Sequence, residues 1–217
     1  MADEKEKKEE YVSEYKPQID GLTQQYNERQ PFSYDPAADA GYQLACRLGH
    51  KVDVLVGDMD SLGISIPEGT VEIHRLPAEK DLTDLQVAVE LAVGRGADEI
   101  IIVSSLSGRL DHTLSTLAIL EDMRGRGIHA YVTDGQNRAR FIRSTSTLIA
   151  RSPYRYLSLI AADETVKGVR VEGCKYPLKK ATLCRCVQFA VSNEITGNVA
   201  FISVKKGGLY IIESKDR

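Results

Sequence analysis

Short apolar runs alternate with helical apolar stripes along the first part of the chain. Runs rich in Val and Ile between polar residues are typical of strands, whereas apolar residues three and four positions apart are typical of helices. The predicted strands are Val52–Val56, Val71–Ile73, Ile100–Val103 and His129–Val132. The predicted helices are Tyr42–Leu48, Leu85–Gly94 with Thr83 as its cap, and a helix from Leu114 that ends at Gly125 or Gly127. Strands that alternate with helices predict right-handed crossovers and a parallel sheet.

The pattern changes near residue 140, after which short strands dominate and no helix is predicted. The expected strands are Tyr156–Ile160, Val166–Val171, Leu183–Ala190, Val199–Val204 and Leu209–Ile212. We therefore predict the α/β fold class, with a parallel-sheet Rossmann-like N-terminal domain followed by a small all-β sandwich domain. The predicted division is a charged extension at 1–30, poorly ordered or helical, an α/β domain at 31–140 and a β-sandwich domain at 141–217.

The composition argues against several classes of partner. The 217 residues carry a net charge of −3 with a pI near 5.9, so no nucleic-acid partner is expected. No apolar run approaches the length of about 20 residues that a helix needs to cross a bilayer, so no membrane partner is expected either. Four cysteines are too few for a disulfide scaffold at this length. These features predict a cytoplasmic protein.

Two carboxylates follow the apolar run that ends at Gly57. Ligands of open α/β sheets bind outside the carboxyl ends of the strands, which is where Asp58 and Asp60 would lie. Two carboxylates this close repel one another unless a cation lies between them, and oxygen ligands alone suit Mg²⁺. The alternative is a solvated turn, because Gly, Asp and Ser are common turn residues.

Two further charged clusters precede predicted helices. Asp81 and Asp84 are three residues apart and share a helical face, where they extend the metal environment or compensate the helix dipole. Arg109 offers a planar fork for a phosphate group, although a surface ion pair is the alternative. The chain has no Gly-x-x-x-x-Gly-Lys-[Ser/Thr] loop, which binds phosphate groups in ordinary P-loop kinases. The negative charge of a bound phosphate group would therefore have to be offset by Mg²⁺ held by carboxylates, together with Lys and Arg side chains.

The ordered set of motifs resembles the thiamine pyrophosphokinase family. The segments that carry the resemblance are Gly57-Asp58-Met59-Asp60-Ser61, Lys80-Asp81-Leu82-Thr83-Asp84, Gly108-Arg109-Leu110-Asp111-His112, Gly173–Leu178 and Ser192-Asn193-Glu194. The resemblance runs from about Asp39 to the C-terminus. It departs from the family at Ala38-Asp39-Ala40-Gly41, because no apolar strand is predicted before this motif.

The resemblance implies a transferase that moves a pyrophosphoryl group from ATP to thiamine, giving thiamine diphosphate and AMP. It also implies Mg²⁺, ATP as co-substrate, and a homodimer with active sites at the subunit junction. The resemblance implies Asp58, Asp60 and Asp81 as the Mg²⁺ ligands with Asp84 nearby, and Asp84, Arg109 and Asp111 as catalytic residues, Asp111 at the thiamine hydroxyl. It also implies Lys80 and Arg109 at the ATP phosphates, and Ser192 and Asn193 at thiamine from the partner subunit. Asp111 could orient the hydroxyl, deprotonate it or hold the metal.

Two other functions remain open from the residues alone. A haloacid-dehalogenase-like phosphatase would use Asp58 as a nucleophile after a strand and would not need ATP. A non-catalytic thiamine- or nucleotide-binding module would retain the fold without turnover. The charged motifs at Asp81, Asp84, Arg109 and Asp111 and the β domain argue against the phosphatase.

Overall fold

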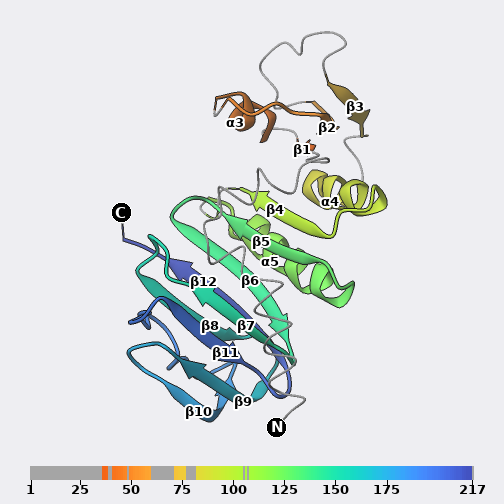
Figure 1. Cartoon of the computed structure of the whole chain (residues 1–217). Helices are drawn as coiled ribbons and strands as arrows, with labels where there is room; N and C mark the ends of the chain where they lie inside the picture. Colours follow the sequence, from red (N-terminus) through yellow and green to blue (C-terminus); the bar gives the residue numbers. More distant parts are fainter. Residues whose placement is uncertain are drawn as a thin grey trace. The chain divides into compact units, whose positions relative to one another are not determined.

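The structure is a computed structural model that describes residues 36–38, 41–47, 49–59, 71–76, 82–104, 106 and 108–216. The predicted N-terminal extension lies outside the described residues. The elements of the described part are β1 (Pro36–Ala38), α3 (Gly41–Arg47), β2 (Val54–Gly57), β3 (Glu72–Arg75), α4 (Asp84–Gly94), β4 (Glu99–Val103), α5 (Leu110–Gly125), β5 (His129–Thr133), β6 (Asn137–Arg143), β7 (Ser146–Ala150), β8 (Tyr156–Ala161), β9 (Thr165–Glu172), β10 (Leu178–Cys184), β11 (Val199–Ser203) and β12 (Gly208–Ser214) (Figure 1).

The chain forms two compact units, which are described separately. One unit holds the described residues of Pro31–Ile100 together with Gly127–His129. The other holds Ile101–Arg126 and the residues from Ala130 onward. Among the described residues, no helix has both the length and the hydrophobicity that crossing a bilayer requires.

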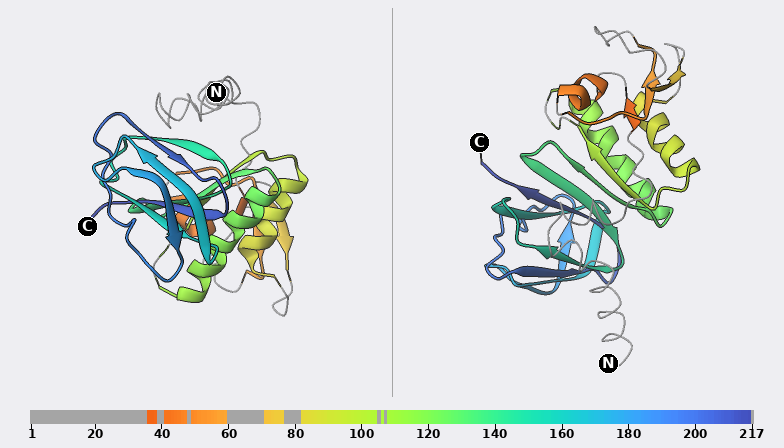
Figure 2. Two further views of the ribbon diagram at one scale, coloured as in Figure 1. Left: turned by 90° about the horizontal axis from the view of Figure 1, so that it is seen from below. Right: turned by 45° about the horizontal axis from the view of Figure 1, so that its top comes forward.

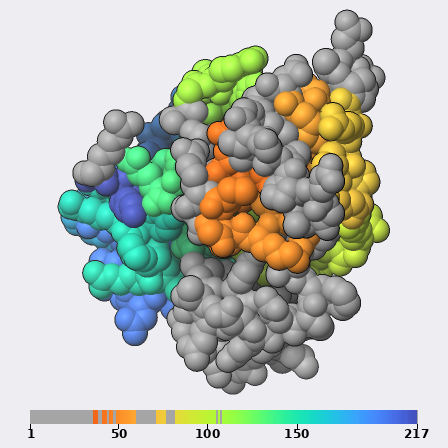
Figure 3. Space-filling model, turned by 90° about the horizontal axis from the view of Figure 1, so that it is seen from above, coloured from red at the N-terminus to blue at the C-terminus, as the bar shows by residue number. Residues whose placement is uncertain are grey.

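The first unit is built on a three-stranded parallel sheet in the order β1-β2-β3. Every residue of the central strand β2 is buried. Its alternate residues face opposite sides, so Val54 and Val56 pack with Ala88 of α4, whereas Leu55 packs with Tyr42 of α3. The segment after α3 is exposed at residues 49–51. In Figure 3, orange atoms of the region from α3 to β2 lie at the surface of the face shown.

A short strand precedes Asp39, contrary to the sequence-based expectation. β1 pairs parallel with β2, with Pro36 opposite Val54 and Ala38 opposite Val56. Its sequence, Pro-Ala-Ala, has no β-branched residue and no alternation, so nothing local indicates a strand. Pro is tolerated because β1 is an edge strand of this sheet.

The second unit contains a five-stranded sheet in the order β4-β5-β6-β12-β8 and a four-stranded sheet in the order β10-β9-β11-β7. One hydrophobic cluster joins them, with Ile142 and Leu209 from the five-stranded sheet and Val169 and Ile202 from the four-stranded sheet. The two sheets therefore pack face to face, as Figure 2 shows. Helix α5 packs against β6.

The predicted fold class is wrong. The described part of the chain is mostly β, and its larger sheets are mixed or antiparallel. β5 is not followed by a helix: the carboxylate of Asp134 accepts hydrogen bonds from the backbone N–H groups of Gln136 at 2.9 Å and Asn137 at 2.6 Å. This turn reverses the chain, so β6 pairs antiparallel with β5 and no continuous parallel sheet extends through this region.

The individual elements agree with the sequence to different degrees. The predicted helix after Thr83 is confirmed, and the Thr83 side chain accepts a hydrogen bond from the Gln86 N–H at 3.2 Å. The predicted strand Leu183–Ala190 is wrong, because β10 begins at Leu178 and ends in a turn in which the Val187 N–H donates to the Cys184 carbonyl at 3.0 Å. β6 and β7 were not expected.

Candidate functional site

Asp58 lies directly after the central strand of the first unit. It is half-buried and follows Gly57, the last residue of β2. The next residue, Met59, has a φ of 71°, a left-handed conformation that is uncommon for a residue with a side chain. Met59 packs against the cluster that contains Tyr42 and Leu55, and this packing holds the turn in place. Asp60 lies outside the described residues.

Asp84 opens helix α4 beside the same sheet. Its Oδ1 atom is buried, although the residue as a whole is only half-buried. Val87 and Ala88 of the first half of α4 pack with Ala38 and Val56, which lie at the carboxyl ends of β1 and β2. Helix α4 therefore begins at the edge of the sheet where Asp58 lies. Lys80 and Asp81 fall outside the described residues.

The donor chemistry at this edge suits a hard cation. Every metal ligand predicted here is a carboxylate, and carboxylate oxygens are the ligands that Mg²⁺ prefers. Asp58 is the one member of the predicted metal set that the described residues include. Among the described residues, no group of three His, Cys, Asp or Glu side chains could hold a metal ion. The half-buried Asp58 in its constrained turn is compatible with such a set.

Arg109 and Asp111 form a two-pronged ion pair at the start of α5, in the second unit. Arg109 donates from Nε to Oδ1 of Asp111 at 3.2 Å and from Nη2 to Oδ2 at 2.6 Å. Both side chains are exposed. The hydrogen bonds with Arg109 lower the pKa of Asp111 to about 2, helped by the His112 N–H, which donates to Oδ1 at 3.0 Å. The same pairing raises the pKa of Arg109.

This pairing defines what Asp111 can do chemically. A carboxyl group with a pKa near 2 is ionised at neutral pH and is a weak base. It can accept a hydrogen bond from a hydroxyl group and orient it. Arg109 uses Nε and Nη2 in the pair, and its guanidinium has five N–H donors in total.

Asn193 lies in the second unit, where its side chain forms hydrogen bonds with the backbone of Tyr176. Its Oδ1 accepts hydrogen bonds from the Tyr176 N–H at 3.0 Å and the Glu194 N–H at 2.9 Å, and its Nδ2 donates to the Tyr176 carbonyl at 2.8 Å. Its backbone N–H and carbonyl pair with Leu157 of β8. Ser192 has a φ of 58°, and its N–H donates to the Ser158 hydroxyl at 2.9 Å.

Comparison with known proteins decides the family. The chain matches the model of the thiamin pyrophosphokinase catalytic domain at residues 24–132 and the model of the thiamin pyrophosphokinase vitamin B1 binding domain at residues 145–209. It is 30% identical to the thiamine pyrophosphokinase of Bacillus subtilis strain 168 over 165 residues, which cover 74% of this chain and 77% of that protein. The chain belongs to the thiamin pyrophosphokinase family.

Solved structures agree with membership of the thiamin pyrophosphokinase family. A thiamin pyrophosphokinase family protein from Enterococcus faecalis is 28% identical with a TM-score of 0.76, covering 86% of this chain and 90% of that chain. The Bacillus subtilis thiamine pyrophosphokinase structure has a TM-score of 0.79, covering 88% of this chain and 92% of that chain, and at 24% identity it supports the fold alone. The catalytic-domain match includes Asp58, Asp84, Arg109 and Asp111, and the binding-domain match includes Ser192 and Asn193.

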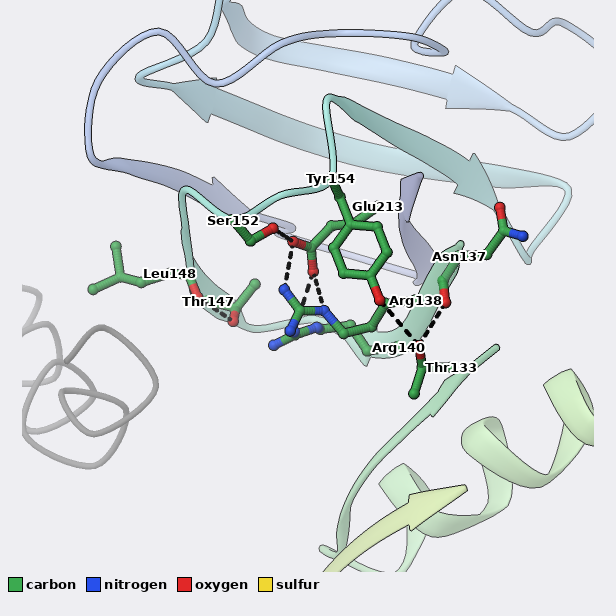
Figure 4. A network of polar contacts seen from close by, with 9 residues as sticks. All are labelled: Thr133, Asn137, Arg138, Arg140, Thr147, Leu148, Ser152, Tyr154 and Glu213. Carbon is green, nitrogen blue, oxygen red and sulfur yellow. Dashed lines mark hydrogen bonds and ion pairs between the residues drawn. The ribbon is translucent and has the colours of Figure 1, made fainter. Parts of the chain in front are cut away.

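Sequence reasoning missed a polar network whose central ion pair, Arg138 with Glu213, lies outside both matched segments. Buried Arg138 donates to buried Glu213 from Nε at 2.8 Å and from Nη2 at 2.6 Å, and Ser152 donates to the same carboxylate at 3.1 Å (Figure 4). The Arg138 guanidinium lies 5.1 Å from the centre of the Tyr154 ring. Arg138 and Glu213 are far apart in sequence, so no local signal indicates that they pair.

Proposed function

We propose that this chain transfers the pyrophosphoryl group of ATP to the hydroxyethyl oxygen of thiamine, producing thiamine diphosphate and AMP. The observation that carries the proposal is that one chain matches, in order, the catalytic and the vitamin B1 binding models of a single enzyme family. A haloacid-dehalogenase-like phosphatase would not be expected to match the vitamin B1 binding model. A non-catalytic module is disfavoured by the match to the catalytic model.

In the proposed site, Asp58, Asp60 and Asp81 hold Mg²⁺, and Asp84 lies nearby. Support comes from the position of Asp58 after a buried parallel strand and from the start of α4 at the same edge of the sheet. Mg²⁺ held by these carboxylates would supply positive charge that offsets the negative charge developing on the phosphate oxygens. Asp58 would be kept in a fixed orientation by the turn at Met59.

Lys80 and Arg109 contact the ATP phosphates in this proposal. Arg109 suits the task because its guanidinium stays charged and its planar fork matches phosphate oxygens. The Arg109–Asp111 pair also restricts the side chain before substrate arrives, which lowers the entropic cost of positioning it.

The Asp111 carboxylate orients the thiamine hydroxyl by accepting a hydrogen bond from it. A strong base is not required, because phosphoryl transfer depends mainly on positioning and charge stabilisation. The low pKa of Asp111, caused by Arg109, keeps its carboxylate available as an acceptor across the neutral range. Deprotonation by Asp111 or metal binding by Asp111 are the competing roles.

Ser192 and Asn193 form the thiamine side of the proposed site. Both fall in the vitamin B1 binding match, which supports their placement there. We further propose that the functional unit is a cytoplasmic homodimer in which these residues serve the partner's site. In this proposal residues 1–30 form an extension, 31–140 the catalytic part and 141–217 the thiamine-binding and dimerisation part. The matches at 24–132 and 145–209 support the boundary near residue 140, whereas the catalytic match begins inside the proposed extension.

Release of AMP from ATP tests the proposal. Purified protein with ATP, thiamine and Mg²⁺ should release AMP at a rate that falls to the background rate without thiamine or with excess EDTA. Hydrolysis of phosphate monoesters without ATP would instead support the phosphatase. Binding of thiamine with no turnover would support the non-catalytic module.

A further inference from the structure

Helix α5 is packed against the protein along its second half only. Arg109 and Asp111 lie at its start, where Leu110 and Leu114 are 69% and 57% exposed. The buried residues of α5 all lie further along the helix: Thr116, Ile119, Leu120 and Met123. The turn that carries the proposed catalytic pair therefore extends beyond the packed part of the helix and depends on that part for its position.

Tyr210 of β12 contacts the packed half of α5 through its hydroxyl group. The hydroxyl donates a hydrogen bond to the Glu121 carboxylate and lies 3.3 Å from the Leu117 carbonyl oxygen, a second acceptor. Leu117 and Glu121 are four residues apart, so they lie on one face of the helix. Contact with both fixes the rotation of α5 about its axis as well as its position along that axis.

The Tyr210 side chain is itself held in the sheet. Its ring meets the ring of Phe141 edge to face, with the ring centres 5.2 Å apart, and the two residues lie opposite each other where β12 pairs with β6. Burial and the hydrogen bond with Glu121 raise the pKa of Tyr210 above its usual value. The hydroxyl therefore keeps its proton at neutral pH and remains a hydrogen-bond donor at a fixed point of the sheet.

A second contact reaches Glu121 from the sheet, and it is the weaker of the two. Arg143 Nη2 lies 3.9 Å from the Glu121 carboxylate, and the Arg143 side chain is 46% exposed. Exposed ion pairs contribute little because water screens them. Arg143 is also engaged by Asp163, to which it donates at 2.9 and 3.0 Å. The Tyr210 hydroxyl is thus the main polar contact between the sheet and Glu121.

Apolar packing alone does not set the orientation of a helix closely. Hydrophobic burial is non-directional, whereas a hydrogen bond weakens steeply when its atoms are misaligned. Asp111 lies ten residues before Glu121 in one continuous helix, which is about 15 Å along the axis. A tilt of only a few degrees at Glu121 therefore moves Asp111 by about 1 Å.

We propose that Tyr210 is a positioning residue for the transfer reaction, whose hydroxyl sets the orientation of α5 and thereby the placement of Arg109 and Asp111. The inference rests on the proposed function. If Tyr210 served only to stabilise the sheet, its ring packing on Phe141 would suffice, and loss of the hydroxyl would leave the rate of transfer unchanged.

The test compares Tyr210→Phe, which removes only the hydroxyl, with Tyr156→Phe. Tyr156 is a matched control on β8 of the same sheet, and its hydroxyl donates to Asp216 at 3.0 Å. Because misplacement by about 1 Å can cost about 10²-fold, kcat for AMP release should fall at least about fivefold in Tyr210→Phe. The thiamine KM should change less than about threefold, because Ser192 and Asn193 lie outside α5. The control should keep kcat within about twofold of the unsubstituted protein.

A double-mutant cycle separates this contact from a general loss of stability. Glu121→Ala removes the acceptor, so adding Tyr210→Phe to it should change kcat by less than about twofold, because the contact is already lost. Glu121→Gln retains an acceptor oxygen and should keep kcat within about threefold of the unsubstituted protein. Two single losses that multiply in the double variant would contradict the proposal.

Hydrogen exchange provides a readout that does not depend on activity. Amides of α5 from Thr116 to Glu121 should exchange faster in Tyr210→Phe, while amides of β6 and β12 keep their protection. If Tyr210→Phe does not fold, Glu121→Ala is judged by the same two measurements. In a folded variant, a kcat within about twofold of the unsubstituted protein, or unchanged exchange in α5, would overturn the proposal. Absence of thiamine-dependent AMP release by the unsubstituted protein would overturn the proposed function instead, since the exchange measurement stands without it.

Discussion

Arg109 and Asp111 illustrate what single residues reveal before and after a structure is known. The motif predicts a cation for phosphate and a carboxylate for the thiamine hydroxyl, and the two side chains, two positions apart, also bind each other. That pairing is local and follows from the spacing. The contacts of Asn193 could not be predicted, because they join it to Tyr176 across a loop whose packing depends on the whole β-rich unit.

Removing the Arg109 side chain should raise the pKa of Asp111. In the folded protein the pKa is lowered to about 2 from an unfolded value of 3.8. The pair therefore stabilises the fold fully above pH 3.8, and this contribution is lost as the pH falls through about 2. In Arg109→Ala, a carboxyl NMR titration should give a pKa well above 2 but still below 3.8, because the His112 N–H continues to donate to Asp111, and in the control Arg124→Ala a pKa still near 2. An Asp111 pKa that stays near 2 in Arg109→Ala would show that Arg109 is not its cause.

At the scale of elements, local signals predicted those strands and helices that do not depend on distant partners. Helix α4 was predicted because Thr83 caps an amphipathic segment. β6 was missed because its Asn-Arg-Ala-Arg-Phe-Ile-Arg sequence places Arg138 inside the protein, and only the distant Glu213 makes that burial acceptable. The parallel-sheet prediction failed at the Asp134 turn, whose hairpin character was not recognised.

Gly173, after β9, should be far less tolerant of substitution than Gly197. A Cβ at Gly173 would lie 2.2 Å from the Val199 carbonyl oxygen, and the residue has a φ of 74°. Gly173→Ala should therefore lower the free energy of unfolding by about 3 kcal/mol. Gly197 has open space around it, so Gly197→Ala should change this free energy by about 0.5 kcal/mol or less. Urea unfolding of both variants provides the measurement, and equal midpoints would contradict the steric account.

At the scale of the whole molecule, the proposed site residues are distributed over two compact units. Asp58 and Asp84 belong to one unit, and Arg109, Asp111 and Asn193 belong to the other. The sequence motifs predicted the family because their order is preserved along the chain, a property that does not require the fold to be known. The fold class was predicted incorrectly because strand partners are chosen in three dimensions.

Hybrid dimers should test the proposed sharing of sites between subunits. If Asn193 serves the partner's site, a dimer of one Asp58→Ala subunit and one Asn193→Ala subunit has one site with both lesions and one with neither. Activity should then return when the two inactive parents are mixed and exchange subunits. A mass tag on one parent verifies the exchange. Verified exchange without recovered activity would mean that each site is built from a single chain.

The most direct measurement follows the β-phosphorus of ATP. The proposed reaction moves the β- and γ-phosphates together, so ATP labelled with ³²P at the β position should yield labelled thiamine diphosphate and unlabelled AMP in equal amounts. This transfer should require thiamine and Mg²⁺. Formation of labelled ADP with thiamine monophosphate, or release of labelled phosphate without thiamine, would contradict the account.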